Sequence, residues 1–149
     1  MLRENPNYRD YLLKFIGSGA RVDEIKELVS SLSLENIVFA GSKTSTELVD
    51  EYNNGELLLL CSEREGFPKV IMEGLSCGIK IASTKVGAVS EVLGEDYPHY
   101  FHEIDPKSMA EVIAGALEDE ATYLHRIDRY SWDILRTQFT EIYSSCLEN

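Results

Sequence analysis

The 149-residue chain lacks several features that would fix its class at once. It has no apolar run close to the roughly 20 residues that a membrane-spanning helix needs. Its first residues lack the apolar central region of a signal peptide, so we expect neither a transmembrane segment nor a secretory leader. Internal repeats and low-complexity stretches are also missing. With 44% hydrophobic and 27% charged residues, the chain is expected to form one globular domain over residues 1–149.

Cysteines and basic residues are both scarce. The cysteines Cys61, Cys77 and Cys146 are odd in number and match no metal-binding spacing. We therefore expect reduced, mostly buried thiols and a cytoplasmic location. The net charge of −12 makes nucleic acid an unfavourable partner, because it is a polyanion.

The negative charge is concentrated in the C-terminal part of the chain. Residues 1–88 carry 10 basic and 13 acidic side chains, a net −3, whereas residues 89–149 carry 4 and 13, a net −9. A small anionic ligand is therefore compatible with the N-terminal part.

Apolar runs alternate with amphipathic runs along most of the chain. Strands are expected at residues 11–17, 37–41, 57–61, 80–83 and, more weakly, 99–102. Helices are expected at residues 22–32, 44–52, 68–76, from 105 onwards and over 131–149. Because the strands are apolar throughout, the pattern predicts an α/β domain whose parallel sheet has helices on both faces.

Start and stop signals support several of these helices. Pro68 suits a first helical position, and Gly78 suits the end of the same helix. Asp105 followed by Pro106 predicts another helix start. The last helix is expected to bury its apolar residues, namely Trp132, Leu135, Phe139, Ile142 and Tyr143.

The sequence Ser-Glu-Arg-Glu-Gly-Phe-Pro at residues 62–68 joins an expected strand to an expected helix. Ligands of open parallel sheets bind at the carboxyl ends of the strands, and N–H groups at a helix start attract phosphate. Because Pro68 has no N–H, the expected donors are Phe67, Lys69 and Val70. Lys69 opposes the helix dipole, which an anion nearby would explain.

Two glutamates flank this helix start. Glu65 belongs to the loop, and Glu73 lies about 8 Å further along the helix at 1.5 Å per residue. Carboxylates accept hydrogen bonds from neighbouring sugar hydroxyls. The pair therefore indicates hydroxyl-binding groups on either side of a phosphate site, although either residue taken alone is more often an ordinary surface carboxylate.

Residues 62–68, together with Glu73 and Gly78, resemble the Glu-x7-Glu signature of retaining glycosyltransferases of the GT-B fold, the glycosyl transferases group 1 family. The flanks are similar too: Phe-Ile-Gly-Ser-Gly at 15–19, Val-Phe-Ala-Gly at 38–41, Val-Gly-Ala at 86–88 with Glu91, and Ser-Trp at 131–132. The resemblance covers residues 11–149 in order. Ala88 departs from it, because a second glycine is usual there, and this leaves the identity of the sugar open.

The resemblance implies a Rossmann-like domain, the C-terminal half of a GT-B fold, that binds a nucleotide-diphosphate sugar of UDP or GDP type. Glu65 is implied as the catalytic residue that contacts the donor sugar, and Glu73 as the ribose contact. The full set implied to bind the donor is Gly66, Phe67, Lys69, Val70, Glu73, Gly17, Gly19 and Gly41. Gly17 and Gly19 are equally explained by a tight turn with positive φ. No metal and no cofactor are implied.

Two parts of the family pattern are not found: the N-terminal acceptor domain, and a first strand whose Arg and Lys hold the diphosphate. Residues 1–10 resemble the end of the helix after that strand. In the usual order 3-2-1-4-5-6, the sheet would lack its central strand.

We therefore expect a donor-binding fragment, inactive alone, whose acceptor domain or partner chain supplies the N-terminal half. A role in polysaccharide or glycolipid biosynthesis, with peripheral membrane association of the full enzyme, is left open. The alternative is a non-catalytic module for nucleotide-sugar binding or protein interaction.

Overall fold

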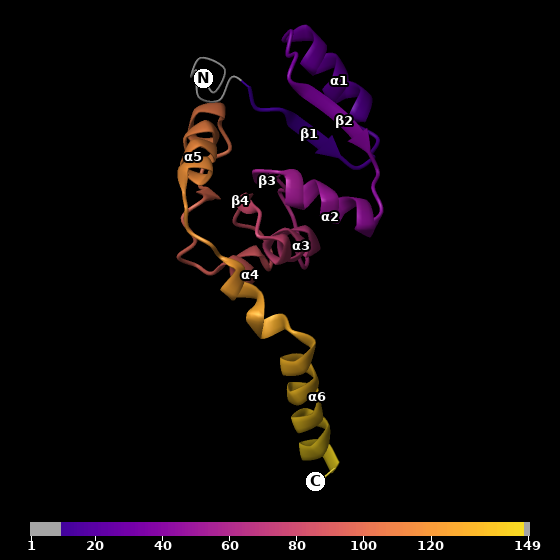
Figure 1. The fold of residues 1–149 in the computed structure, drawn as a ribbon, viewed down its shortest axis with the longest axis vertical. Coiled ribbons are helices and arrows are strands. Elements are labelled where there is room, and N and C mark those ends of the chain that lie inside the picture. The colour runs from indigo at the N-terminus through magenta and orange to yellow at the C-terminus, as the bar shows by residue number, and fades with distance from the viewer. Residues whose placement is uncertain (1–9, 148–149) are drawn as a thin grey trace. The chain divides into compact units, whose positions relative to one another are not determined.

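The computed structural model describes residues 10–147, so the prediction for residues 1–10 falls almost wholly outside the described part. Strands and helices alternate along the chain (Figure 1), which confirms the α/β class. The elements are β1 (Leu13–Ile16), α1 (Val22–Ser31), β2 (Ile37–Gly41), α2 (Ser45–Asn54), β3 (Leu57–Leu60), α3 (Lys69–Cys77), β4 (Lys80–Thr84), α4 (Val89–Leu93), β5 (Tyr100–Phe101), α5 (Pro106–Glu118), the 3-10 helix η3 (Leu124–Tyr130) and α6 (Trp132–Leu147).

The predicted elements are all present, with small shifts at their ends. Pro68 directly precedes α3 instead of forming its first residue, and Gly78 ends the helix with φ +77°. Asp105 caps α5 by accepting hydrogen bonds from the N–H groups of Lys107 and Ser108. Helices α4 and η3 were not predicted, because each is short and has no capping side chain.

The strands form two parallel sheets among the described residues. β1 pairs with β2, and β3, β4 and β5 pair in that order. No strand pairing joins the two groups within residues 10–147.

The chain also divides into two compact units within α2, one up to Glu51 and one from Tyr52 onwards. Each unit is described by itself. The prediction of one nucleotide-sugar-binding domain over residues 1–149 stays a prediction.

The unit from Tyr52 onwards has helices on both faces of its three-stranded sheet. Side chains alternate along each strand, so neighbouring residues join different clusters. Ile81 and Tyr100 belong to a buried cluster with residues of α3 and α4, namely Ile71, Leu75, Val89, Val92 and Leu93. Ala82 and Phe101 pack with Ala116 of α5. The four leucines of β3 divide between these clusters in the same alternation.

The unit up to Glu51 has no such closed core. The rings of Phe15 on β1 and Phe39 on β2 stack with centroids 5.1 Å apart, and α1 half-buries part of its apolar stripe. None of residues 10–51 is buried. Because this unit buries little apolar surface, its polar contacts contribute a larger share of its stability.

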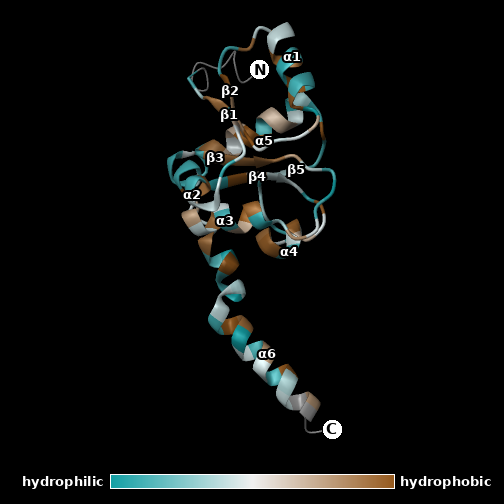
Figure 2. Ribbon diagram, turned by 90° about the vertical axis from the view of Figure 1, so that its right-hand side faces the viewer, coloured by the Kyte–Doolittle hydropathy of each residue, from teal (hydrophilic) through white to brown (hydrophobic). Residues whose placement is uncertain are grey.

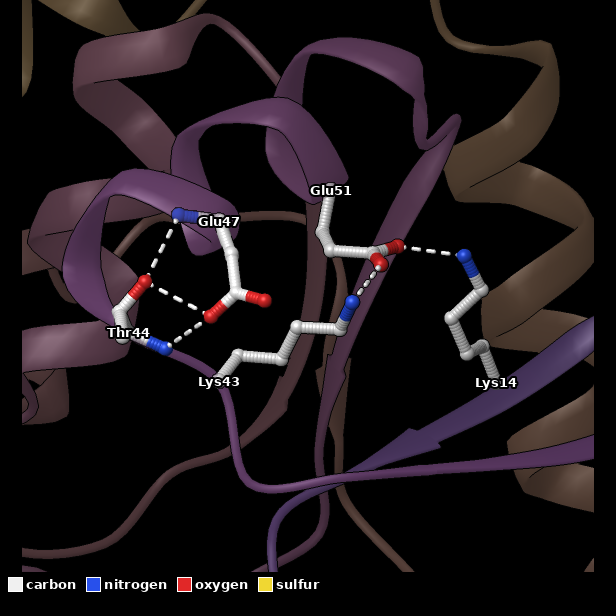
Figure 3. Close-up of polar contacts among 5 residues, drawn as sticks. All are labelled: Lys14, Lys43, Thr44, Glu47 and Glu51. Atoms are coloured by element: carbon white, nitrogen blue, oxygen red, sulfur yellow. Dashed lines mark hydrogen bonds and ion pairs between the residues drawn. The ribbon is translucent and has the colours of Figure 1, made fainter.

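Figure 3 shows these polar contacts around α2. The N–H and Oγ1 of Thr44 donate to Glu47 Oε2 at 2.8 and 2.7 Å, and the Glu47 N–H donates to Thr44 Oγ1 at 3.3 Å. This reciprocal pair is a capping box, and its backbone hydrogen bond lowers the pKa of Glu47. Glu51 pairs with Lys14 at 2.5 Å and Lys43 at 3.1 Å, and these bonds lower its pKa.

Two predictions about burial are wrong. Trp132 is 85% exposed and Tyr143 68%, and Phe139 and Ile142 are also exposed, because η3 is the main element packed against α6 in the described part of the chain. Brown and teal segments alternate along α6 in Figure 2, so its apolar residues are set among polar ones. The thiols of Cys61 and Cys146 are exposed and that of Cys77 is half-buried.

Within residues 10–147, every helix is too short or too polar to span a membrane.

Candidate functional site

The loop of residues 61–68, called the motif loop below, connects the carboxyl end of β3 to α3. Pro68 is buried, with φ −81° and ψ 78°, and the Lys69 N–H donates to the Phe67 carbonyl at 2.9 Å. The chain therefore makes a tight turn immediately before the helix. Of the three predicted phosphate donors, the Lys69 N–H is engaged inside the loop, while those of Phe67 and Val70 stay predictions.

The two glutamates differ in their surroundings. Glu65 is half-buried on the motif loop, and Glu73 is exposed on α3. The hydroxyl of Tyr52 donates to Glu73 Oε2 at 3.1 Å. Burial, followed by the Glu73 carboxylate, raises the pKa of Tyr52, so the phenol stays a neutral donor. A carboxylate has two oxygens, so Tyr52 orients Glu73 through one of them and the other remains an acceptor for a ligand.

Tyr52 is a site residue that sequence reasoning missed. The sequence analysis gave it only as the last residue of the helix expected at 44–52, and it is buried, with 7% exposure. It lies 21 residues from Glu73, and no local pattern links the two positions.

The other predicted residues of the motif loop and α3 lie on the surface. Phe67 is 49% and Val70 37% exposed, and Lys69 is also exposed. The ring of Phe67 meets that of Tyr130 edge-on, with centroids 5.7 Å apart. The structure therefore brings Glu65, Gly66 and Phe67 together at the start of α3, beside a surface that a ligand can reach.

The motif loop rests on residues 84–88, which follow β4. Thr84 Oγ1 donates to the Ser62 carbonyl at 2.7 Å, and the Ala88 N–H donates to the Gly66 carbonyl at 3.2 Å. Gly87 lies between them with φ +54°. The sequence marked residues 86–88 as a flank of the motif, with Ala88 bearing on the identity of the sugar, but did not predict that they contact the motif loop.

The cations near the loop are unevenly available. Lys85 pairs with Glu95 at 2.5 Å, and this hydrogen bond lowers the pKa of Glu95. Lys69 and Arg64 are exposed. Lys69 is thus the better placed cation at the start of α3.

Gly17, Gly19 and Gly41 lie at the carboxyl ends of β1 and β2, in the unit up to Glu51. The Gly17 N–H donates to the Gly41 carbonyl at 2.8 Å, and Ser42 Oγ donates to Ser18 Oγ at 2.9 Å. Gly17 has φ +129° and Gly41 has φ +68°, whereas Gly19 is not in this range. The tight-turn explanation therefore holds for Gly17 and fails for Gly19.

A second polar cluster surrounds His99, which the sequence analysis did not single out. His99 Nε2 is 2.7 Å from Asp119 Oδ2, which also accepts from the Tyr123 hydroxyl at 2.8 Å. The Ala121 N–H donates to Asp119 Oδ1 at 2.8 Å. The Ala121 hydrogen bond, then those of His99 and Tyr123, lower the pKa of Asp119 to about 2.

Among the described side chains, no three His, Cys, Asp or Glu residues gather closely enough to hold a metal ion.

Solved structures share this fold. The crystal structure of the Anabaena protein HepE in complex with UDP matches 97% of this chain and 43% of its own, with a TM-score of 0.77 and 21% identity. A glycosyltransferase from Rickettsia africae matches 94% of this chain and 41% of its own, also with a TM-score of 0.77 and 21% identity. The fold is thus that of GT-B glycosyltransferases.

The chain belongs to the family described as Glycosyl transferases group 1, whose model matches residues 1–132. Among curated relatives, N-acetyl-alpha-D-glucosaminyl L-malate synthase of Bacillus anthracis is 31% identical over 119 residues. The match covers 78% of this chain and 30% of that enzyme. The chain therefore spans about a third of this relative's length.

Proposed function

We propose that this chain is the donor-binding part of a retaining glycosyltransferase that uses a nucleotide-diphosphate sugar of UDP or GDP type. The observation that carries the proposal is the motif loop, which ends a parallel strand and enters α3 with Glu65 before the helix and Glu73 within it. Helix starts favour phosphate, and carboxylates favour sugar hydroxyls. The UDP bound by HepE gives this donor class independent support.

Each residue has a separate task in this proposal. Glu65 contacts the donor sugar and serves as the catalytic residue, while Glu73, oriented by Tyr52, holds the ribose. The diphosphate lies along Gly66, Phe67 and Val70, with the Lys69 ammonium as its counter-charge. Gly17, Gly19 and Gly41, in the unit up to Glu51, are proposed as nucleotide-binding residues on the family resemblance alone. Positioning and electrostatic stabilisation supply most of the catalysis.

The acceptor side of the reaction is proposed to come from an acceptor domain or partner chain beyond these 149 residues. The support is the share of 30% that this chain covers in the Bacillus anthracis relative. A cytoplasmic setting is part of the same proposal, in keeping with three free thiols in the described residues.

Calorimetric titration of the full chain with UDP, GDP and ADP tests the donor site. We expect one nucleotide to bind, and Glu73→Gln to weaken it by about ten- to a hundredfold, because hydrogen bonds to charged groups contribute about 1.5–3 kcal/mol. Glu65→Gln should leave the affinity for the nucleotide unchanged, because a nucleotide that lacks the transferred sugar does not reach Glu65.

Glu63→Gln is the matched control, because Glu63 is an exposed carboxylate of the same loop. It should bind the nucleotide as the unmodified chain does. A folded chain that binds none of the three nucleotides, or a Glu73→Gln variant with unchanged affinity, contradicts the proposal.

A further inference from the structure

Residues 84–88 touch the motif loop on both sides of Glu65. Before Glu65, Thr84 Oγ1 donates to the carbonyl of Ser62 at 2.7 Å. After it, the carbonyl of Gly66 accepts from the Ala88 N–H at 3.2 Å. The path of the backbone that carries the Glu65 side chain is therefore bracketed by two hydrogen bonds from the same segment.

Gly87 makes the closest approach between the segment and the loop. A Cβ added to Gly87 would lie 1.9 Å from the Glu65 carbonyl oxygen and 3.2 Å from that of Gly66. These are backbone atoms, which cannot yield unless the loop itself moves. The φ of +54° also favours glycine at this position. Any side chain at Gly87 therefore displaces the motif loop.

Thr84 supplies the other constraint. Thr84 is 5% exposed. Its Oγ1 lies 2.7 Å from the carbonyl oxygen of Ser62 and 3.4 Å from that of Leu60. Without the hydroxyl, the Ser62 carbonyl would face an apolar group at the point where the chain leaves β3. Leaving such a group unsatisfied costs more than a hydrogen bond normally contributes.

We propose that Thr84 and Gly87 are positioning residues that fix the path of the motif loop, and with it the place of the Glu65 carboxylate in the donor site. They act through the backbone of Ser62, Glu65 and Gly66 and do not touch the donor. The identity of the ligand rests on the proposed function, whereas the path of the loop can be measured without any ligand.

Hydrogen–deuterium exchange of the full chain tests the loop directly. Thr84→Val removes the hydroxyl at nearly constant shape, and Gly87→Ala introduces the clash. In both variants we expect the amides of residues 61–67 to exchange about tenfold faster, the equivalent of one lost hydrogen bond. Thr84→Ser keeps the hydroxyl and should restore slow exchange.

Two control variants separate loop positioning from a general loss of stability. Tyr97→Phe removes another buried hydroxyl, which donates to the Ile81 carbonyl at 2.7 Å. Gly78→Ala strains a backbone with φ +77° where an added Cβ meets nothing within 4 Å. Neither control should accelerate exchange in residues 61–67 beyond the change seen in the rest of the sheet.

UDP titration of the same proteins separates this proposal from the proposed function. If the unmodified chain binds UDP, we expect Thr84→Val to weaken binding about tenfold, because the diphosphate is proposed to lie along Gly66 and Phe67 of the same loop, and Thr84→Ser to restore it. If it binds no UDP but the loop amides respond as expected, the donor proposal fails and the positioning of the loop stands. Unchanged loop exchange in Thr84→Val, or no restoration by Thr84→Ser, overturns the positioning role.

Discussion

At the scale of single residues, a few buried or half-buried polar side chains tie together segments that are distant in the sequence. Thr84 connects β4 to the motif loop, Tyr52 orients Glu73, and Asp119 gathers His99 and Tyr123. Each of these groups has its partners in place, as buried polar groups require. Such contacts determine where the loops and the 3-10 helix lie on the sheet.

Asp119 should make the stability of the protein sensitive to acid. Its pKa is about 2 in the folded chain against an ordinary 3.8, so the folded state holds the proton less tightly than the unfolded state. The stabilisation is therefore complete above about pH 4 and is lost as the pH falls through about 2. We expect Asp119→Asn to lower the free energy of unfolding at pH 7 by about 1–3 kcal/mol and to flatten its slope between pH 4 and 2, measured by urea denaturation.

Glu120→Gln is the control for this effect, because Glu120 is an exposed neighbouring carboxylate. Its unfolding should depend on pH as that of the unmodified chain does. An Asp119→Asn variant that keeps the original acid slope would show that another group is responsible.

Residue-scale contacts were the part of the site least accessible from the sequence. The motif at residues 62–68 and Glu73 could be located, because their spacing and flanks are local. The partners Tyr52, Thr84 and Asp119 could not, because their roles arise only when strands and helices pack. Even Gly87 was noticed only as part of a pattern, since its contact with Glu65 depends on the path of two loops.

At the scale of elements, the ends of several helices are set by capping residues that can be recognised in the sequence. Asp105 and Pro106 begin α5, and Gly78 ends α3 in the left-handed conformation. Thr44 and Glu47 form the capping box of α2. These elements were predictable because a cap involves residues within one turn of one another.

The cap of α5 offers a test at this scale. Asp105 Oδ1 accepts from the N–H groups of Lys107 at 2.9 Å and Ser108 at 3.1 Å. Asp105→Ala should therefore lower the free energy of unfolding by about 1 kcal/mol, and Asp105→Ser should keep most of it. Thermal and urea unfolding measure the change.

Glu111→Ala, an exposed position further along α5, is the matched control and should change stability little. Equal loss in Asp105→Ala and Glu111→Ala would mean that the cap contributes nothing specific.

At the scale of the whole molecule, burial is shared unequally between the two units. All the buried hydrophobic residues belong to the unit from Tyr52 onwards, whereas residues 10–51 bury none. The sequence did not reveal this difference, because the apolar runs of β1 and β2 look like those of β3 and β4. Burial depends on which strands and helices meet, and the described strands pair in two separate sheets.

The difference should be visible in amide exchange of the full chain. β4 lies between two strands, and its Ile81 and Ala82 have 0% exposure. We expect its amides to exchange at least about a hundredfold more slowly than those of β1 and β2, because local opening is easier where little apolar surface is buried. Equal protection of the two sheets would show that residues 10–51 are stabilised by contacts beyond those described.

The exposure of α6 also determines what an optical probe can report. Trp132 is the single tryptophan of the chain, and it is 85% exposed at the start of that helix. The fluorescence of its indole therefore reports on α6 and on anything that covers this helix. We expect it to change little with the packing of the sheet. The folding of the unit from Tyr52 onwards is instead followed through its buried tyrosines, Tyr97 and Tyr100, or through backbone circular dichroism.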